Sequence, residues 1–221
     1  YDFNDAASFG QVDGIKAIRS PGSTLKPLVY GLGIDLGIIT PKSMIKDVPS
    51  NFDGFTPENF NKKYNGLVSV EFALSNSLNI PAVDLLDKIG VNEFLRTAIK
   101  SGFKSFIKQK KKLGLSVALG GCGTSLEELV QFYAGLSVLG KRVELKYHFD
   151  PSSPQGNIRF LSKEAAFLIN QILSIQSRPD FPNAFSSTIR IPKIYWKTGT
   201  SFGKKDAWSI GFNHKYTIGV W

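Results

Sequence analysis

Apolar residues recur with helical spacing through most of the chain. After the Ser20-Pro21-Gly22 turn, residues 25–36 are almost wholly apolar and predict a buried helix, in which Pro27 is tolerable only because it falls near the first turn. Further helices are expected at 68–74, at 82–89 between Pro81 and Gly90, at 92–101, at 126–139 before Gly140, and from Ser162 to about Ile175. Thr124-Ser125-Leu126-Glu127 predicts a capping box at the start of the 126–139 helix.

From residue 189 the pattern changes to short strands separated by turns. Strands are expected at 189–191, at 194–196 leading into Lys197-Thr198-Gly199, at 207–212 and at 216–221. A further short strand is expected at 11–18, and a long connection rich in Pro, Asn, Asp and Gly at 39–65. Helices followed by an antiparallel meander predict an α+β fold.

Composition indicates a single globular domain over residues 1–221. Hydrophobic residues make up 42% of the chain, and no run of about 18 apolar residues is present to span a bilayer. Cys122 is the only cysteine, which excludes an internal disulfide, and the only histidines are His148 and His214. We therefore expect no metal site and no cofactor.

The formal net charge of +9 raises the possibility of a polyanionic partner, such as nucleic acid or an anionic envelope polymer. The densest lysine cluster, at 104–112, lies in a polar segment that is typical of a solvated surface. No basic motif interleaved with aromatic residues is present, so we do not expect nucleic-acid binding.

Three short motifs follow one another in an order that suits serine acyl transfer: Ser23-x-x-Lys26, Ser77-x-Asn79 and Lys197-Thr198-Gly199-Thr200. Ser-x-x-Lys occurs five times in the chain and is uninformative alone, whereas the other two motifs occur once each. The order of the three therefore carries the prediction.

The first motif can supply a nucleophile and its base. A serine hydroxyl reacts poorly until a nearby base takes its proton, and residues three apart on a helix share a face, which brings Lys26 beside Ser23. Burial and a second cation, for which Lys197 is the candidate, can lower the pKa of Lys26 from about 10.4. The unpaired N–H groups at a helix start also favour negative charge developing at Ser23.

The other two motifs can supply the rest of an acyl-transfer site. Ser77 can pass a proton between Lys26 and a leaving amine, and the Asn79 amide can hold a substrate peptide group. Lys197, Thr198, Gly199 and Thr200 can bind a terminal carboxylate and a substrate backbone along a strand edge. The backbone N–H groups of Ser23 and Thr200 can form an oxyanion hole.

Each motif also has an ordinary structural explanation. Ser23 can simply cap a helix with Lys26 solvated, Ser77 and Asn79 can cap the helix that starts at Pro81, and Lys197-Thr198-Gly199 can be a plain strand end. The expected capping box accounts for Glu127, so we do not expect it or Glu128 to act as a base. Asp206 is expected to be a turn residue, and the two histidines to be inert.

Taken together, the motifs resemble the transpeptidase domain of class A penicillin-binding proteins, most of all the 1C type. The resemblance rests on the stretches at 19–27, 77–83 and 197–208, and it extends to Asp47-Val-Pro49, Leu119-Gly-Gly121 and Gly219-Val-Trp221. It covers nearly the whole chain.

The resemblance implies a penicillin-recognising fold, in which a mostly antiparallel sheet lies between helices and a helical subdomain. It implies a serine D,D-transpeptidase that crosslinks peptidoglycan stem peptides ending in D-Ala-D-Ala through an acyl-enzyme on Ser23, and that β-lactams acylate. It further implies a location on the outer, periplasmic face of the inner membrane. Family members also carry a membrane anchor and a glycosyltransferase domain, which these residues lack, so we expect a partial domain truncated at both ends.

Two other classes of function stay open from the sequence. A serine β-lactamase or D,D-carboxypeptidase on the same fold would let water resolve the acyl-enzyme, but no clear Glu-x-x-x-Asn loop of the class A β-lactamase kind lies between Asn79 and Lys197. A non-catalytic sensor of β-lactams or wall peptides would be expected to lack Lys26 or Ser77, and both are present.

Overall fold

The helices in a computed structural model of the chain lie close to where the apolar spacing predicts them. The structure describes residues 4, 5, 7, 10–148, 157–174 and 193–221. The longer helices are α1 (Lys26–Asp35), α3 (Ile80–Ile89), α4 (Val91–Ser101), α6 (Leu126–Ser137) and α7 (Lys163–Leu173), with the shorter α2 (Val70–Ser75) and α5 (Ser105–Gln109). The 3-10 turns of the described residues are η1 (Gly22–Leu25), η2 (Leu115–Leu119) and η4 (Phe202–Lys204). Helix α7 ends at Leu173, and the expected end at residue 175 lies outside the described residues.

The predicted capping box of α6 is displaced by one residue. Ser125, not Thr124, is the N-cap, and its side chain accepts a hydrogen bond from the Glu128 backbone N–H at 3.2 Å. Glu128 completes the box, so Glu127 is not the capping carboxylate. The N-cap residue has extended backbone geometry, which Ser125 adopts here and the sequence pattern alone could not distinguish from Thr124.

The meander at the end of the chain is confirmed. Strands β3 (Tyr195–Thr200), β4 (Ala207–Phe212) and β5 (Thr217–Val220) form one antiparallel sheet in the order β3-β4-β5. Its register pairs Lys197 with Ile210 and Gly199 with Trp208. The strand expected at 189–191 lies outside the described residues.

Two short strands in the first third of the chain were not predicted, and one predicted strand is wrong. β1 (Met44–Asp47) lies inside the expected 39–65 connection, and β2 (Gly66–Ser69) occupies the start of the expected 68–74 helix. They pair with each other as a separate antiparallel sheet. Residues 11–18 form turns, because Asp13 Oδ1 accepts hydrogen bonds from the backbone of Ile15 and Lys16.

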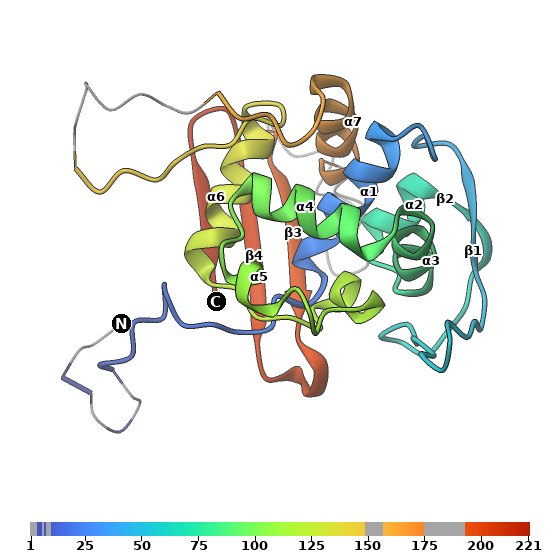
Figure 1. Cartoon of the computed structure of the whole chain (residues 1–221), viewed down its shortest axis with the longest axis horizontal. Coiled ribbons are helices and arrows are strands. Elements are labelled where there is room, and N and C mark those ends of the chain that lie inside the picture. The colour runs from blue at the N-terminus through green and yellow to red at the C-terminus, as the bar shows by residue number, and fades with distance from the viewer. Residues whose placement is uncertain (1–3, 6, 8–9, 149–156, 175–192) are drawn as a thin grey trace, which may run out of the picture.

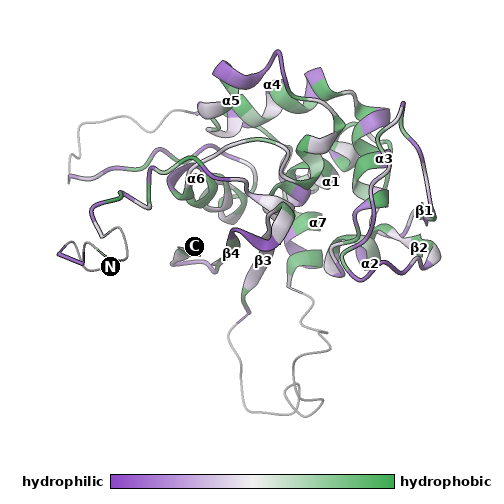
Figure 2. Cartoon of the chain, turned by 90° about the horizontal axis from the view of Figure 1, so that it is seen from below, coloured by the Kyte–Doolittle hydropathy of each residue, from purple (hydrophilic) through white to green (hydrophobic). Residues whose placement is uncertain are grey.

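The α+β class is confirmed, with the helices on one side of the larger sheet and beside its β3 edge. Helix α6 packs on β4 and β5, while α1, α2, α3 and α7 lie on the β3 side of the sheet, with the small sheet at the outer edge (Figure 1). Coloured by hydropathy, α6 carries many hydrophobic residues, whereas hydrophilic residues are frequent in the loops (Figure 2). Among the described residues, one apolar core joins α1, α3, α4, α6 and α7 to β4, and α1 runs through it.

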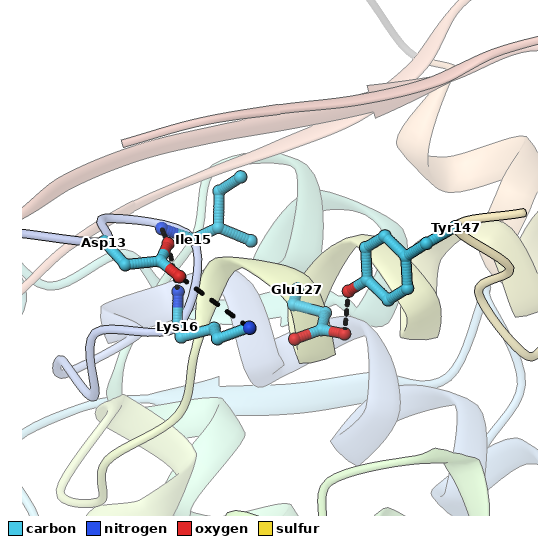
Figure 3. A network of polar contacts seen from close by, with 5 residues as sticks. All are labelled: Asp13, Ile15, Lys16, Glu127 and Tyr147. Atoms are coloured by element: carbon cyan, nitrogen blue, oxygen red, sulfur yellow. Dashed lines mark hydrogen bonds and ion pairs between the residues drawn. The ribbon is translucent and has the colours of Figure 1, made fainter. Parts of the chain in front are cut away.

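The start of the described chain is held against α6. The Glu127 backbone N–H donates to the Ile15 carbonyl at 3.2 Å, and the Glu127 carboxylate accepts a hydrogen bond from the Tyr147 hydroxyl. Figure 3 shows these side chains with the Asp13 turn and the ion pair of Asp13 with Lys16. Glu127 therefore contacts two surface segments, one through its backbone N–H and the other through its carboxylate.

Candidate active site

Ser23 lies in the 3-10 turn η1, immediately before α1, and is partly exposed while its neighbours are buried. The turn is closed by the Thr24 backbone N–H, which donates to the Pro21 carbonyl at 3.2 Å, and by the Thr24 hydroxyl, which donates to the same oxygen at 2.9 Å. Within the part of the chain that the structure describes, the Ser23 side chain caps no helix. The hydroxyl is therefore the one polar side chain of the turn that faces outward.

Two residues that sequence reasoning missed hold this turn from neighbouring elements. Tyr133 of α6 donates its hydroxyl proton to the Thr24 carbonyl at 2.8 Å, and Trp208 of β4 donates from its indole Nε1 to the Ser20 carbonyl at 2.8 Å. Buried tyrosine and tryptophan side chains need such partners. Trp208 lies in one of the stretches that carried the family resemblance, and that was the only signal for it in the sequence.

Glycines let the Ser23 turn pack directly on strand β3. A methyl group built on Gly199 would lie 2.4 Å from the Pro21 carbonyl oxygen, and one on Gly22 would lie 2.4 Å from the Thr200 carbonyl oxygen. Gly22 also has φ of +54°, which favours glycine. Gly199 thus brings β3 against the nucleophile turn, a closer approach than any side chain would permit.

Lys26 is the first residue of α1 and is fully buried, at 0% exposure. Its amine donates to the Ser77 carbonyl at 2.6 Å and to the Asn79 side-chain oxygen Oδ1 at 2.6 Å, and it lies 3.5 Å from the Ser77 hydroxyl. The explanation in which Lys26 is a solvated surface residue is therefore wrong. Its hydrogen bonds go to the second motif and not to Ser23, so direct contact between Ser23 and Lys26 stays a prediction.

Burial holds the pKa of Lys26 well below its ordinary value, and the positive charge of Lys197 lowers it further. The negative charge of Asp47 acts in the opposite direction and is the smallest of the three effects. The cause that the sequence suggested, burial together with a second cation, is confirmed. A neutral amine has two N–H groups, which the two short bonds use, and one lone pair, which remains to accept a proton.

Ser77 lies between the two lysines. Its hydroxyl accepts a hydrogen bond from the Lys197 amine at 2.8 Å and lies 3.5 Å from the Lys26 amine. Ser77 has φ of +56°, an uncommon conformation for a residue with a side chain, which costs about 1–3 kcal/mol and is typical of functional sites. The second motif is thus a strained turn that directs one hydroxyl between two amines.

Asn79 is bound on both sides of its amide. Oδ1 accepts from Lys26, and Nδ2 donates to the Glu58 carbonyl at 2.6 Å. Asn79 is the N-cap residue of α3, but its side chain makes no capping hydrogen bond, so the capping explanation for it is wrong. One Nδ2 proton is left for a substrate group.

The third motif forms the outer strand of the larger sheet next to Ser23. Lys197 is buried, at 3% exposure, and its amine also donates to the Thr198 carbonyl at 2.9 Å. Thr200 is exposed and adjoins Gly22, as the methyl-group contact shows. Within the described sheet, β3 pairs only with β4, so its other edge faces the turn that carries Ser23.

Among the other residues that the sequence singled out, Asp206 has a structural contact. Asp206 is buried at the end of the turn, directly before β4, and accepts a hydrogen bond from Trp221 Nε1 at 3.1 Å, so it is a structural residue. The described residues contain no group of three or more His, Cys, Asp or Glu side chains placed to hold a metal ion. They also contain no helix long and apolar enough to cross a membrane.

Comparison with known proteins assigns the chain to a family. Residues 10–220 match the family described as the penicillin binding protein transpeptidase domain. The chain therefore belongs to the penicillin-binding protein transpeptidase family, whose members act on peptidoglycan outside the cytoplasm.

Within the family, the resemblance to the class A type is confirmed. The chain is 39% identical, over its whole length, to penicillin-binding protein 1C of Escherichia coli, of which it covers 28%. It is 28% identical to penicillin-binding protein 4 of Bacillus subtilis, of which it covers 35%. The chain thus spans about a third or less of the length of these relatives.

Solved structures share the fold at lower identity. Penicillin-binding protein 1A of Haemophilus influenzae superimposes with a TM-score of 0.74 at 21% identity, over 91% of this chain and 37% of that one. The transpeptidase domain of penicillin-binding protein 3 of Burkholderia pseudomallei gives a TM-score of 0.76 at 17% identity, over 91% and 69%. These neighbours establish the fold of the chain.

Proposed function

We propose that this chain is a serine D,D-transpeptidase domain that crosslinks peptidoglycan stem peptides ending in D-Ala-D-Ala. The observation that carries the proposal is the buried Lys26 amine, whose pKa is held low beside the Ser77 hydroxyl, to which the Lys197 amine also donates a hydrogen bond. A site of this kind can take a proton at neutral pH and return it.

In the first half of the reaction, Ser23 Oγ attacks the carbonyl carbon of the penultimate D-Ala and its proton passes to Lys26. The backbone N–H groups of Ser23 and Thr200 stabilise the oxyanion, a contribution of about 3–4 kcal/mol per donor in a studied protease. The C–N bond to the last D-Ala then breaks, and the leaving nitrogen takes the proton from Lys26 through the Ser77 hydroxyl. The product is an ester on Ser23 and free D-Ala.

In the second half, an amine of another stem peptide attacks the ester carbonyl. Its proton returns by the same residues to Ser23 Oγ as the C–O bond breaks, which leaves the new amide crosslink and the free enzyme. Lys197, Thr198, Gly199 and Thr200 bind the donor peptide as an added strand on β3, with the charge of Lys197 opposite its carboxylate. The spare Nδ2 proton of Asn79 holds a peptide carbonyl of the same substrate.

The same chemistry makes β-lactam antibiotics ligands of the site, because opening of their ring leaves an ester on Ser23. We place the whole protein at the periplasmic face of the inner membrane, with a glycosyltransferase activity in a separate domain, as its relationship to the 1C type supports.

Intact mass after incubation with penicillin tests the proposal. We expect one covalent adduct, mapped to a peptide that contains Ser23, and none in a Lys26→Ala variant that keeps its fold by circular dichroism. Acylation of Lys26→Ala at the unmodified rate would mean that the base lies elsewhere.

A chase with a fluorescent penicillin separates this function from its rivals. Label that persists for many minutes supports a transpeptidase, and label lost within seconds supports a β-lactamase or carboxypeptidase, in which water resolves the ester. Stable acylation with no crosslinking of stem peptides would instead indicate a sensor.

A further inference from the structure

We propose that Asp47 and Asn59 are positioning residues of the acyl-transfer site, which hold the Ser77–Asn79 turn against Lys26. The inference rests on the proposed function and extends it to two buried side chains that lie outside the three motifs. Neither touches Ser23, and both act through Asn79 and the lysine.

The Asp47 carboxylate is the buried anchor of the arrangement. It ends strand β1 at 0% exposure and accepts hydrogen bonds from Asn59 Nδ2 at 2.8 and 3.0 Å, from the Asn65 backbone N–H at 2.9 Å and from Asn65 Nδ2 at 2.7 Å. A buried carboxylate is costly unless its oxygens are satisfied in this way. The loop that carries Asn59 is therefore folded around a negative charge.

Asn59 connects Asp47 to the second motif by hydrogen bonds. Its Nδ2 donates to Asp47 and to the Lys63 carbonyl at 2.9 Å, and its Oδ1 accepts from the Asn79 backbone N–H at 2.7 Å. With 4% exposure and every side-chain group engaged, the planar amide has one orientation. Hydrogen bonds thus run without interruption from Asp47 through Asn59 and Asn79 to the Lys26 amine.

This anchorage explains how the strained turn persists. Ser77 keeps its φ of +56° because Lys26 holds its carbonyl on one side, and Asn59 holds the Asn79 backbone N–H on the other. Strained residues survive where surrounding contacts over-determine them. Loss of either contact would free the Ser77 hydroxyl to leave its place between the two amines.

Asp47 also acts on Lys26 through its negative charge, which the neutral amides of Asn59 and Asn79 do not have. The groups that act on Lys26 are Lys197 from β3, which lowers its pKa, and Asp47 from β1, which raises it. Tyr30, one turn along α1, has its pKa raised by burial and then by Asp47 and by Asp84 of α3, so it stays neutral. Asp47 therefore offsets part of the lowering and makes Lys26 a stronger base.

The first test is the pH profile of acylation by fluorescent penicillin in the intact protein. Asp47→Asn removes the charge that raises the pKa of Lys26, so Lys26 should lose its proton at lower pH. The acid limb of the profile, in which the acylation rate rises with pH, should therefore move to lower pH. The maximal rate should fall at least about tenfold, because the turn is misplaced. The matched control is Asp53→Asn in the same connection, an exposed carboxylate whose loss should leave both rate and limb unchanged.

The second variant separates position from charge. Asn59→Ala removes the acceptor of the Asn79 N–H but keeps the Asp47 carboxylate, so we expect a similar loss of rate with no movement of the acid limb to lower pH. If Asp47 had a purely structural role, the Asp47→Asn variant would be acylated more slowly by the same factor at every pH, and its acid limb would not move. That result would overturn the inference.

The outcomes distinguish this inference from the proposed function. If the unmodified protein is not acylated on Ser23, the proposed function fails. If it is acylated, and both variants keep the acylation rate and the acid limb of the unmodified protein, only the positioning role fails. If Asp47→Asn loses its fold by circular dichroism, Asn59→Ala decides; loss of fold in both would indicate a role in folding alone and would overturn the proposal.

Discussion

The Tyr133 hydroxyl donates a buried hydrogen bond to the carbonyl oxygen of Thr24, the residue that follows Ser23, and the two oxygens are 2.8 Å apart. Tyr133 is fully buried, and burial raises its pKa, so the phenol is the neutral donor at all ordinary pH values. The bond ties the proposed nucleophile to the middle of α6, which is separated from it by about half the chain.

Tyr133→Phe should therefore weaken both stability and reactivity. The ring stays, but the buried Thr24 carbonyl loses its donor, which costs about 1–3 kcal/mol. Urea unfolding should show this loss, and the rate of penicillin acylation should fall several-fold. Unfolding at the unmodified denaturant midpoint would contradict the account, and Tyr147→Phe, at an exposed surface contact, serves as the matched control.

Lys197→Ala should move the pH profile of acylation in the opposite direction to loss of Asp47. The positive charge of Lys197 lowers the pKa of Lys26, so its removal raises that pKa. Fewer molecules then carry the neutral amine near pH 7, and the acid limb shifts to higher pH. Stopped-flow acylation between pH 5 and 9 would measure the shift, with exposed Lys205→Ala as the charge control. An unmoved limb would show that the two amines are not coupled.

Lys26→Met should flatten the pH dependence of stability. The pKa of Lys26 is about 10.4 unfolded and well below that when folded, so between the two values the unfolded chain binds more protons. Stability due to this residue is thus greatest above the unfolded pKa, and falls by about 1.4 kcal/mol per pH unit as pH drops toward the folded pKa. Denaturant unfolding at pH 7 and pH 9.5 should show a smaller rise with pH in the variant. An equal rise in both proteins would mean that Lys26 is not buried neutral.

Gly22→Ala should disrupt the site by steric clash. The new methyl group would meet the Thr200 carbonyl oxygen at 2.4 Å, and φ of +54° disfavours alanine by about 1–2 kcal/mol. We expect lower thermal stability and at least about tenfold slower acylation, because the turn must move away from β3. Gly114→Ala, where a methyl group meets nothing within 4 Å, is the control and should be neutral. Normal acylation by Gly22→Ala would show that close packing on β3 is dispensable.

Local pattern determined much of this protein, because helices and hairpins depend on neighbours in the chain. The apolar run after Pro21, the Pro81–Gly90 limits and the turns around 202–205 and 213–215 were sufficient to predict α1, α3 and the meander. The order of three short motifs was sufficient to predict Ser23, Lys26, Ser77 and Lys197 as one candidate site. Strands β1 and β2 escaped prediction because each is four residues long and is stabilised by the other across the intervening loop.

Only the tertiary structure decided how those residues act on one another. The apolar run at 25–36 predicts a buried helix, but it does not show which groups surround the Lys26 amine, because these come from Ser77, Asn79 and strand β3. The contributions of Tyr133, Asp47 and Asn59 depend in the same way on distant segments meeting. A pKa, unlike a helix, is set by the charges and the solvent exclusion that folding brings around a group, and these are properties of the assembled core.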